Sequence, residues 1–233
     1  MHRFFVSELS KSTPDFILSE EESKHACRVL RLTNGQAIEI INGKGDLFIG
    51  EIVDNHPKRC AVKINNVYSE SPEKKRIHIA ISPTKNMDRF EWFVEKATEI
   101  GVNEITPLFG ENSERKTLKR ERLDKLLISA TKQSKRLFIP QLNEPSSTSD
   151  FIAKTSFAYI AHCETNHSRN FLAPDDLQTD FTIMVGPEGD FSNKEIHLAL
   201  SKGFKPVTLG DNRLRTETAG IYAVTLAKIF QHG

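Results

Sequence analysis

The segment that decides the fold spans residues 181–220 and reads FTIMVGPEGDFSNKEIHLALSKGFKPVTLGDNRLRTETAG. Two apolar runs in it, FTIMVG at 181–186 and PVTLG at 206–210, have the length and composition of buried strands. A polar, glycine-bearing loop and then a helical pattern follow each run, and the first helix opens with the capping box Ser192–Glu195. This alternation predicts a parallel sheet that is covered by helices on both faces.

The same alternation extends back to residue 77. Further strands are expected at IHIAIS (77–82), EITPLF (104–109) and FAYIAH (157–162), and further helices at 89–100, 114–136 and 218–230. Gly101 lies where a helix C-cap belongs.

The first seventy residues have a different period. Short alternating apolar runs, AIEIING (37–43), LFIGEIV (47–53) and CAVKINNV (60–67), predict a small antiparallel barrel with one helix at 19–30. The polar stretch SESPEKKR at 69–76 has the composition of a linker. We therefore expect two domains, 1–72 and 73–233.

Three strand ends carry unusual loops. In parallel sheets ligands bind beyond the carboxyl ends of the strands, so the loops at 185–192, 209–220 and 161–164 are the candidate site. Taken singly, GPEG is often only a tight turn and TET only a helix cap. At successive strand ends of one sheet, the two together favour a ligand site. His162, Cys163, Glu164 and His167 lack a zinc-type spacing, and no metal is expected. GxGxxG and P-loop motifs are absent, which argues against a NAD enzyme or a P-loop NTPase.

Composition sets the remaining limits. The 233 residues carry 32 Lys and Arg against 31 Asp and Glu, a net charge of +1. No apolar run approaches the ~20 residues of a membrane span. Nothing at the N-terminus has the pattern of a secretion signal, and three scattered cysteines argue for a reducing compartment, so a cytoplasmic location is expected.

Basic residues gather between residues 113 and 136. This segment contains nine Lys and Arg residues and three Asp and Glu residues, so its net charge is +6. The ordinary interpretation is a solvated helix face, but the dominance of one sign favours contact with a nucleic-acid backbone. Near-neutrality of the whole chain therefore does not exclude an RNA partner.

The paired motifs GPEG at 186–189 with Phe191-Ser192, and LG…LRTETA at 209–219, resemble the ribosomal RNA small subunit methyltransferase E family of the SPOUT superfamily. Supporting matches in family order are RFFV at 3–6, His25 with RVLRL at 28–32, EKATEIGV at 95–102, and ATKQSKR at 130–136 before Ile139-Pro140. The resemblance implies a PUA-like N-terminal barrel, an α/β domain with a trefoil knot, and a homodimer. It also implies S-adenosyl-L-methionine as cofactor, with methylation of N3 of one uridine in 16S rRNA as the reaction. The RNA partner is then free 16S rRNA or the assembled small ribosomal subunit, with no membrane and no metal.

The resemblance also implies site residues. The cofactor-binding set is His162, Met184, Val185, Gly186, Pro187, Gly189, Leu209, Gly210, Leu214, Arg215 and Thr218. We expect Arg215 to stabilise negative charge on the uracil oxygens, and Glu217, followed by Glu188, is the candidate base or orienting group. Either carboxylate could instead hold an arginine or the ribose of the donor. The RNA-binding candidates are Arg3, Arg28, Arg31, Arg115, Lys116, Lys119, Arg120, Lys132 and Arg136.

Two departures and two alternatives remain. Asp190 stands where the family usually has a second glycine, and Asn212-Arg213 replaces a more usual arginine–aliphatic pair. The alternative functions are a SPOUT methyltransferase with a different RNA target, and a non-catalytic RNA-binding or ribosome-assembly protein.

Overall fold

The computed structural model describes residues 1–164, 169–172 and 179–232, and its contacts divide the chain into two units. The first unit comprises residues Met1–Pro72 and Thr131–Ile139. The second comprises Glu73–Ala130 and Pro140–Gly233. The predicted division after residue 72 placed the whole of 73–233 in one domain, whereas the structure groups 131–139 with the N-terminal unit.

The first unit is a five-stranded sheet in the order β1-β3-β4-β5-β2. Its strands are β1 (Arg3–Phe5), β2 (Asp15–Ile17), β3 (Ala37–Ile41), β4 (Asp46–Asp54) and β5 (Ala61–Ser69). The predicted antiparallel pairing is confirmed for β3 with β4, β4 with β5 and β2 with β5, whereas β1 pairs with β3 in parallel. A parallel pair is possible because a long connection separates the two strands. That connection contains α1 (Glu20–Lys24), capped by the Ser19 hydroxyl, and a π-helical turn at His25–Val29.

Backbone hydrogen bonds attach residues 131–139 to the first unit. The Gly45 amide donates to the Leu137 carbonyl, and the Ile139 amide donates to the Gly43 carbonyl. A β-bridge joins Lys44 to Phe138. Gly45 has φ +104°, a conformation that side chains disfavour, and a Cβ there would lie 2.4 Å from the Phe138 ring. Glycine at this turn therefore permits the close approach.

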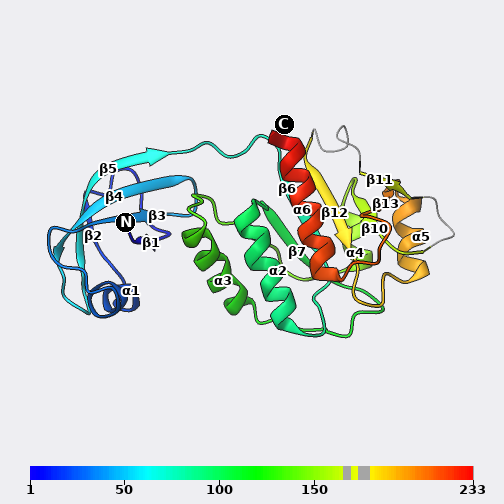
Figure 1. Ribbon diagram of the computed structural model, residues 1–233, viewed down its shortest axis with the longest axis horizontal. Helices are drawn as coiled ribbons and strands as arrows, with labels where there is room; N and C mark the ends of the chain where they lie inside the picture. The colour runs from blue at the N-terminus through cyan, green and yellow to red at the C-terminus, as the bar shows by residue number, and fades with distance from the viewer. Residues whose placement is uncertain (165–168, 173–178, 233) are drawn as a thin grey trace. The chain divides into compact units, whose positions relative to one another are not determined.

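The second unit is a parallel α/β sheet, as the strand–helix alternation predicts (Figure 1). The strand order is β11-β13-β10-β12-β6-β7-β8, and β9 pairs with β7. The strands are β6 (Ile77–Ile81), β7 (Glu104–Phe109), β8 (Gln141–Leu142), β9 (Ser146–Ser147), β10 (Tyr159–Ala161), β11 (Asn170–Phe171), β12 (Phe181–Val185) and β13 (Lys205–Thr208). The helices are α2 (Met87–Ile100), α3 (Arg120–Gln133), α4 (Thr148–Lys154), α5 (Asn193–Ser201) and α6 (Thr216–His232).

Helices cover both faces of this sheet. On one face α2 and α6 pack side by side, and α6 lies against β6 and β12 (Figure 1). On the other face Phe151 of α4 and Ile196 of α5 share a core with Ala80 and Met184 of the strands. Successive strand residues point to opposite faces, so the runs must be apolar throughout. The trefoil knot implied by the resemblance stays a prediction.

The basic segment is the main local difference from expectation. The predicted helix at 114–136 begins only at Arg120 and ends at Gln133. Ahead of it the chain folds back on itself, because the Gly110 amide donates to the Ser113 hydroxyl and Lys116 donates to the Gly110 carbonyl. Such local side-chain bonds compete with helix formation. Arg115, Lys116 and Lys119 therefore lie outside the helix.

In the described ranges, no helix is long and apolar enough to cross a membrane.

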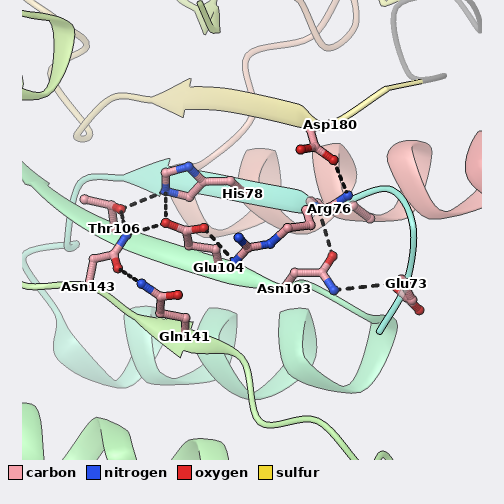
Figure 2. Close-up of polar contacts among 10 residues, drawn as sticks. Glu73, Arg76, His78, Asn103, Glu104, Thr106, Gln141, Asn143 and Asp180 are labelled. Atoms are coloured by element: carbon pink, nitrogen blue, oxygen red, sulfur yellow. Dashed lines mark hydrogen bonds and ion pairs between the residues drawn. The ribbon is translucent and has the colours of Figure 1, made fainter. Parts of the chain in front are cut away.

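A polar cluster surrounds His78 of β6 and extends across β7 to the segment after β8 (Figure 2). The imidazole lies 2.7 Å from the Thr106 hydroxyl and 3.8 Å from Glu104, and the Asn143 amide donates to both of these residues. Arg76 pairs with the other oxygen of Glu104. Burial lowers the pKa of His78; Glu104 opposes this shift and Arg76 adds to it. Burial therefore favours the neutral imidazole in the folded protein.

This depressed pKa predicts a loss of stability in acid. The unfolded chain takes up a proton at His78 below its ordinary pKa of about 6.5, and the folded protein resists it, so stability rises with pH through this window. We expect the free energy of unfolding to fall as pH drops from 7.5 to 5, with a slope from this one group of at most about 1.4 kcal/mol per pH unit. His78→Gln should flatten the dependence in denaturant titrations, while a control at the exposed His2, His2→Gln, should not. Equal slopes in the two variants would contradict the assignment.

Candidate functional site

A cavity of about 450 Å³ opens at the carboxyl ends of three neighbouring strands. Its walls are the segments that follow β10, β12 and β13. Because β10 lies between β13 and β12 in the sheet, these loops leave the same edge side by side. The volume is within the range of small-molecule sites.

Side-chain and backbone hydrogen bonds fix the loops. The buried Thr216 hydroxyl, at the start of α6, donates to the Gly186 carbonyl at 3.0 Å. Arg213 donates to the Glu188 carbonyl at 3.1 Å. Gly210 has φ +142°, which favours glycine, and a Cβ on Gly186 would lie 3.1 Å from the Phe191 amide nitrogen. Both glycines are thus required by the loop geometry.

The lining offers apolar and charged surface. Val185, Val207, Leu209 and Leu214 supply the apolar area. Charged residues of both signs also line the cavity: Glu188, Asp190, Asp211, Arg169, Arg213 and Arg215. Apolar side chains suit a flat heteroaromatic ring, and side chains of opposite charge suit a ligand that carries a cationic and an anionic group. The residues present therefore fit a molecule that carries an adenosyl group together with charges of both signs.

Most predicted cofactor residues line this cavity. They are His162, Val185, Gly186, Pro187, Leu209, Gly210, Leu214 and Arg215. The other three do not line it. Met184 is fully buried in the core of the sheet, and Gly189 lines a second cavity of about 550 Å³. Thr218 is exposed and lines neither of the two cavities. Thr216 and Ala219 take the place expected of Thr218, because α6 begins at Thr216 and its periodicity turns residue 218 to another face. Sequence reasoning also missed Arg169 of the lining, because the sequence around it carries no motif.

The two candidate carboxylates are in different places. Glu188 lines the cavity, and its Oε1 accepts a hydrogen bond from the Lys85 amide at 3.0 Å. Glu217 does not line the cavity: it is 8% exposed, and its Oε1 lies 4.0 Å from Nε of Arg89 on α2. The geometry therefore favours Glu188 over Glu217, the reverse of the order derived from the sequence.

Arg213 and Arg215 are exposed cations of this lining, and Arg213 already donates to the Glu188 carbonyl. Arg215 is the other. It immediately precedes α6 and lines the cavity. Among the described residues its guanidinium has no carboxylate within ion-pair distance. It is therefore available to a ligand.

Several basic candidates are committed to intramolecular pairs. Arg3 forms an ion pair with Glu39 at 2.7 Å with only 8% of its side chain exposed, and it also donates to the Arg136 carbonyl. Arg120 pairs with Glu144 and Lys132 with Glu22. Arg115 donates to the Lys85 carbonyl. Acids outside the segment thus neutralise part of its +6 balance, a contribution that sequence counting could not include.

The exposed members of the basic set are Arg28, Arg31, Lys116, Lys119 and Arg120. Of these, Lys116 donates to the Gly110 carbonyl and Arg120 is paired with Glu144. In the part of the chain that the structure describes, no group of three His, Cys, Asp or Glu side chains could hold a metal ion.

The whole chain has clear relatives. Residues 71–228 match the RNA methyltransferase domain family, and residues 18–65 match the RNA methyltransferase PUA domain family. A parallel-sheet domain with a strand-end cavity, joined to a PUA domain, defines the class of RNA methyltransferases.

Individual relatives narrow the class. The chain is 30% identical over 230 residues to a ribosomal RNA small subunit methyltransferase E from Mesomycoplasma hyopneumoniae, covering 97% of this chain and 98% of the relative. A crystal structure of a probable rRNA-methyltransferase from Porphyromonas gingivalis is 36% identical, with a TM-score of 0.90 and coverage of 100% and 99%. A ribosomal RNA small subunit methyltransferase E from Neisseria gonorrhoeae, bound to S-adenosyl methionine, is 26% identical, with a TM-score of 0.83 and coverage of 97% and 96%. The chain belongs to the ribosomal RNA small subunit methyltransferase E family.

Proposed function

We propose that this protein transfers a methyl group from S-adenosyl-L-methionine to N3 of a uridine in 16S rRNA. The observation that carries the proposal is the strand-end cavity with Arg215 at its rim, an arginine with no ion pair among the described residues, in a chain whose relative binds S-adenosyl methionine. Bound there, the donor supplies an activated sulfonium methyl group. The protein must orient the acceptor and assist the loss of the N3 proton.

The chain's own residues divide this work. Leu209, Leu214 and Val207 would hold the adenosyl group, and Thr216 keeps the Gly186 carbonyl in place beside it. Arg215 would stabilise the negative charge that spreads onto the uracil oxygens as N3 loses its proton. Glu188 is the carboxylate within the cavity that could accept that proton or orient the base. Because the Lys85 amide donates to Glu188, its side chain is already held in one orientation.

Two measurements test the function. The wild-type protein should bind S-adenosyl-L-methionine in calorimetry, and 16S rRNA from cells that lack the protein should lose N3-methyluridine in nucleoside mass spectrometry. Absence of donor binding would favour the alternative of a non-catalytic RNA-binding protein. Donor binding together with persistent N3-methyluridine would favour an enzyme with another target.

We also propose a homodimer that acts in the cytoplasm. Trp92 of α2 is 46% exposed, and Tyr222 and Ile229 of the neighbouring α6 are 43% and 58% exposed. Large apolar side chains exposed on adjacent helices suit an interface between two copies. Sedimentation analysis should give twice the mass of one chain, and Tyr222→Lys should shift the protein toward the monomer mass of 26.4 kDa.

Binding of rRNA should depend more on exposed than on paired cations. Lys119 is exposed, whereas its neighbour Arg120 is paired with Glu144. A cation that contacts a phosphate releases counterions, so Lys119→Gln should reduce the slope of log K against log salt by about 1. Arg120→Gln is the matched control and should change the slope less. Equal slopes for Lys119→Gln and wild type would remove Lys119 from the interface.

A further inference from the structure

Three loops of the second unit meet at Asp190, a residue for which the mechanism above has no role. Asp190 Oδ2 accepts a hydrogen bond from the Cys163 amide at 2.6 Å, and its Oδ1 accepts one from the Phe191 amide at 2.8 Å. The Asn112 side chain donates to the Asp190 carbonyl at 3.1 Å. Cys163 follows β10, Asn112 follows β7, and Asp190 follows β12.

The contact to Cys163 is the one that joins two walls of the cavity. Strands β10 and β12 are neighbours in the sheet, with Ala161 opposite Val185. Beyond these residues the ladder ends, and the segments after both strands line the donor cavity. The Asp190 carboxylate joins them again beyond the strand ends. A hydrogen bond from an amide to a charged acceptor is stronger than one between neutral groups.

The backbone at Asp190 is itself demanding. Its φ is +65°, in the left-handed region that glycine adopts freely and aspartate tolerates better than most residues. Glycine would therefore relieve the backbone at this position. The aspartate side chain offers what glycine cannot, two acceptor oxygens for two separate amides.

We propose that Asp190 is a positioning residue that fixes the segment after β10 against the loop after β12 and so sets the width of the methyl-donor site. The proposal rests on the donor site described under the proposed function. Asp190 also lines the cavity, but each of its carboxylate oxygens accepts a hydrogen bond from a backbone amide, so it acts by holding the loops and takes no part in proton or methyl transfer.

The test compares three variants of the full-length protein. Asp190→Gly keeps the left-handed backbone and removes both acceptors, and Asp190→Asn keeps one acceptor oxygen. Lys135→Gly is the matched control, because Lys135 also has a positive φ, +60°, and belongs to the first unit. Calorimetry with S-adenosyl-L-methionine gives the dissociation constant, and steady-state assays on rRNA give kcat and the KM for the donor.

We expect Asp190→Gly to weaken donor binding about tenfold, equivalent to roughly 1.4 kcal/mol, with kcat at saturating donor close to that of wild type. The donor affinity of Asp190→Asn should lie between those of Asp190→Gly and wild type, and Lys135→Gly should have the wild-type donor dissociation constant. A merely structural role would lower the melting temperature without changing the donor dissociation constant. Wild-type donor affinity in Asp190→Gly would overturn the proposal.

Hydrogen exchange separates this proposal from the proposed function. In the absence of any ligand, the amide of Cys163 should exchange faster in Asp190→Gly than in wild type, because its acceptor is gone. Unchanged exchange would overturn the role of Asp190 even if the protein proves to be a methyltransferase. A wild-type protein that binds no donor, but loses Cys163 protection in the variant, would instead count against the proposed function.

Discussion

Arg215→Ala should reduce methyl transfer by about 100- to 1,000-fold in kcat, the loss measured when a single donor to a developing oxyanion is removed. The side chain lines the donor cavity, is exposed, and has no ion pair among the described residues. Its charge is therefore free to interact with a uracil that loses its N3 proton. Single-turnover assays with rRNA measure the chemical step, and calorimetry should show donor affinity changed far less than kcat.

Two further variants make this prediction specific. Arg215→Lys keeps the charge but loses the planar pair of donors, so we expect activity between that of wild type and Arg215→Ala. Lys202→Ala removes an exposed cation at the end of α5 and controls for net charge. Normal turnover in Arg215→Ala would remove Arg215 from the mechanism.

Gly220→Ala should destabilise the second unit although it improves the helix. Alanine in place of glycine within α6 gains about 1 kcal/mol of helix propensity. The added Cβ, however, would lie 2.6 Å from Phe93 Cε2 and 2.8 Å from Ile81 Cδ1, and both side chains are fully buried. Overpacking of a close-packed core costs about 1–3 kcal/mol, so the net effect of alanine is a loss. Gly220→Leu should lower the free energy of unfolding by more than about 3 kcal/mol and prevent stable packing of α6.

A double-mutant cycle identifies the cause. Phe93→Leu shortens the side chain that the new methyl group meets, so Gly220→Ala should cost less in that background. A coupling energy of about 0.5 kcal/mol or more from calorimetric melts supports the clash. Additive effects, or a higher melting temperature for Gly220→Ala alone, would contradict it.

Much of the second unit could be predicted from local pattern. The apolar runs at 77–82, 104–109 and 181–186 became β6, β7 and β12, and the capping box at Ser192 starts α5 with both of its hydrogen bonds. The periodicity of strands and helices and the residues that cap helices depend on positions a few residues apart, so they can be recognised in the sequence alone. The short strands β1, β2, β8, β9 and β11 were missed, because two or three residues carry no period.

The donor site could be predicted as a set of loops but not as a set of side chains. Gly186, Leu209, Gly210, Leu214 and Arg215 line the cavity as expected. Glu217 and Thr218 do not, because where α6 begins decides which of residues 215–219 face the cavity. A shift of one residue turns a helical side chain by about 100°. Motif spacing cannot determine that start.

The sequence by itself determined the parallel α/β class, the loops that form the site and the clustering of basic residues, because each follows from neighbouring residues. Only the tertiary structure decided which charges remain available. Arg3 is paired with Glu39, Lys132 with Glu22 and Glu188 with the Lys85 amide, across sequence separations of 36, 110 and 103 residues. Charge pairing depends on distance in space, and the fold alone brings such distant residues within a few ångströms. For the same reason the role of Asp190 could be inferred only once Cys163 lay beside it.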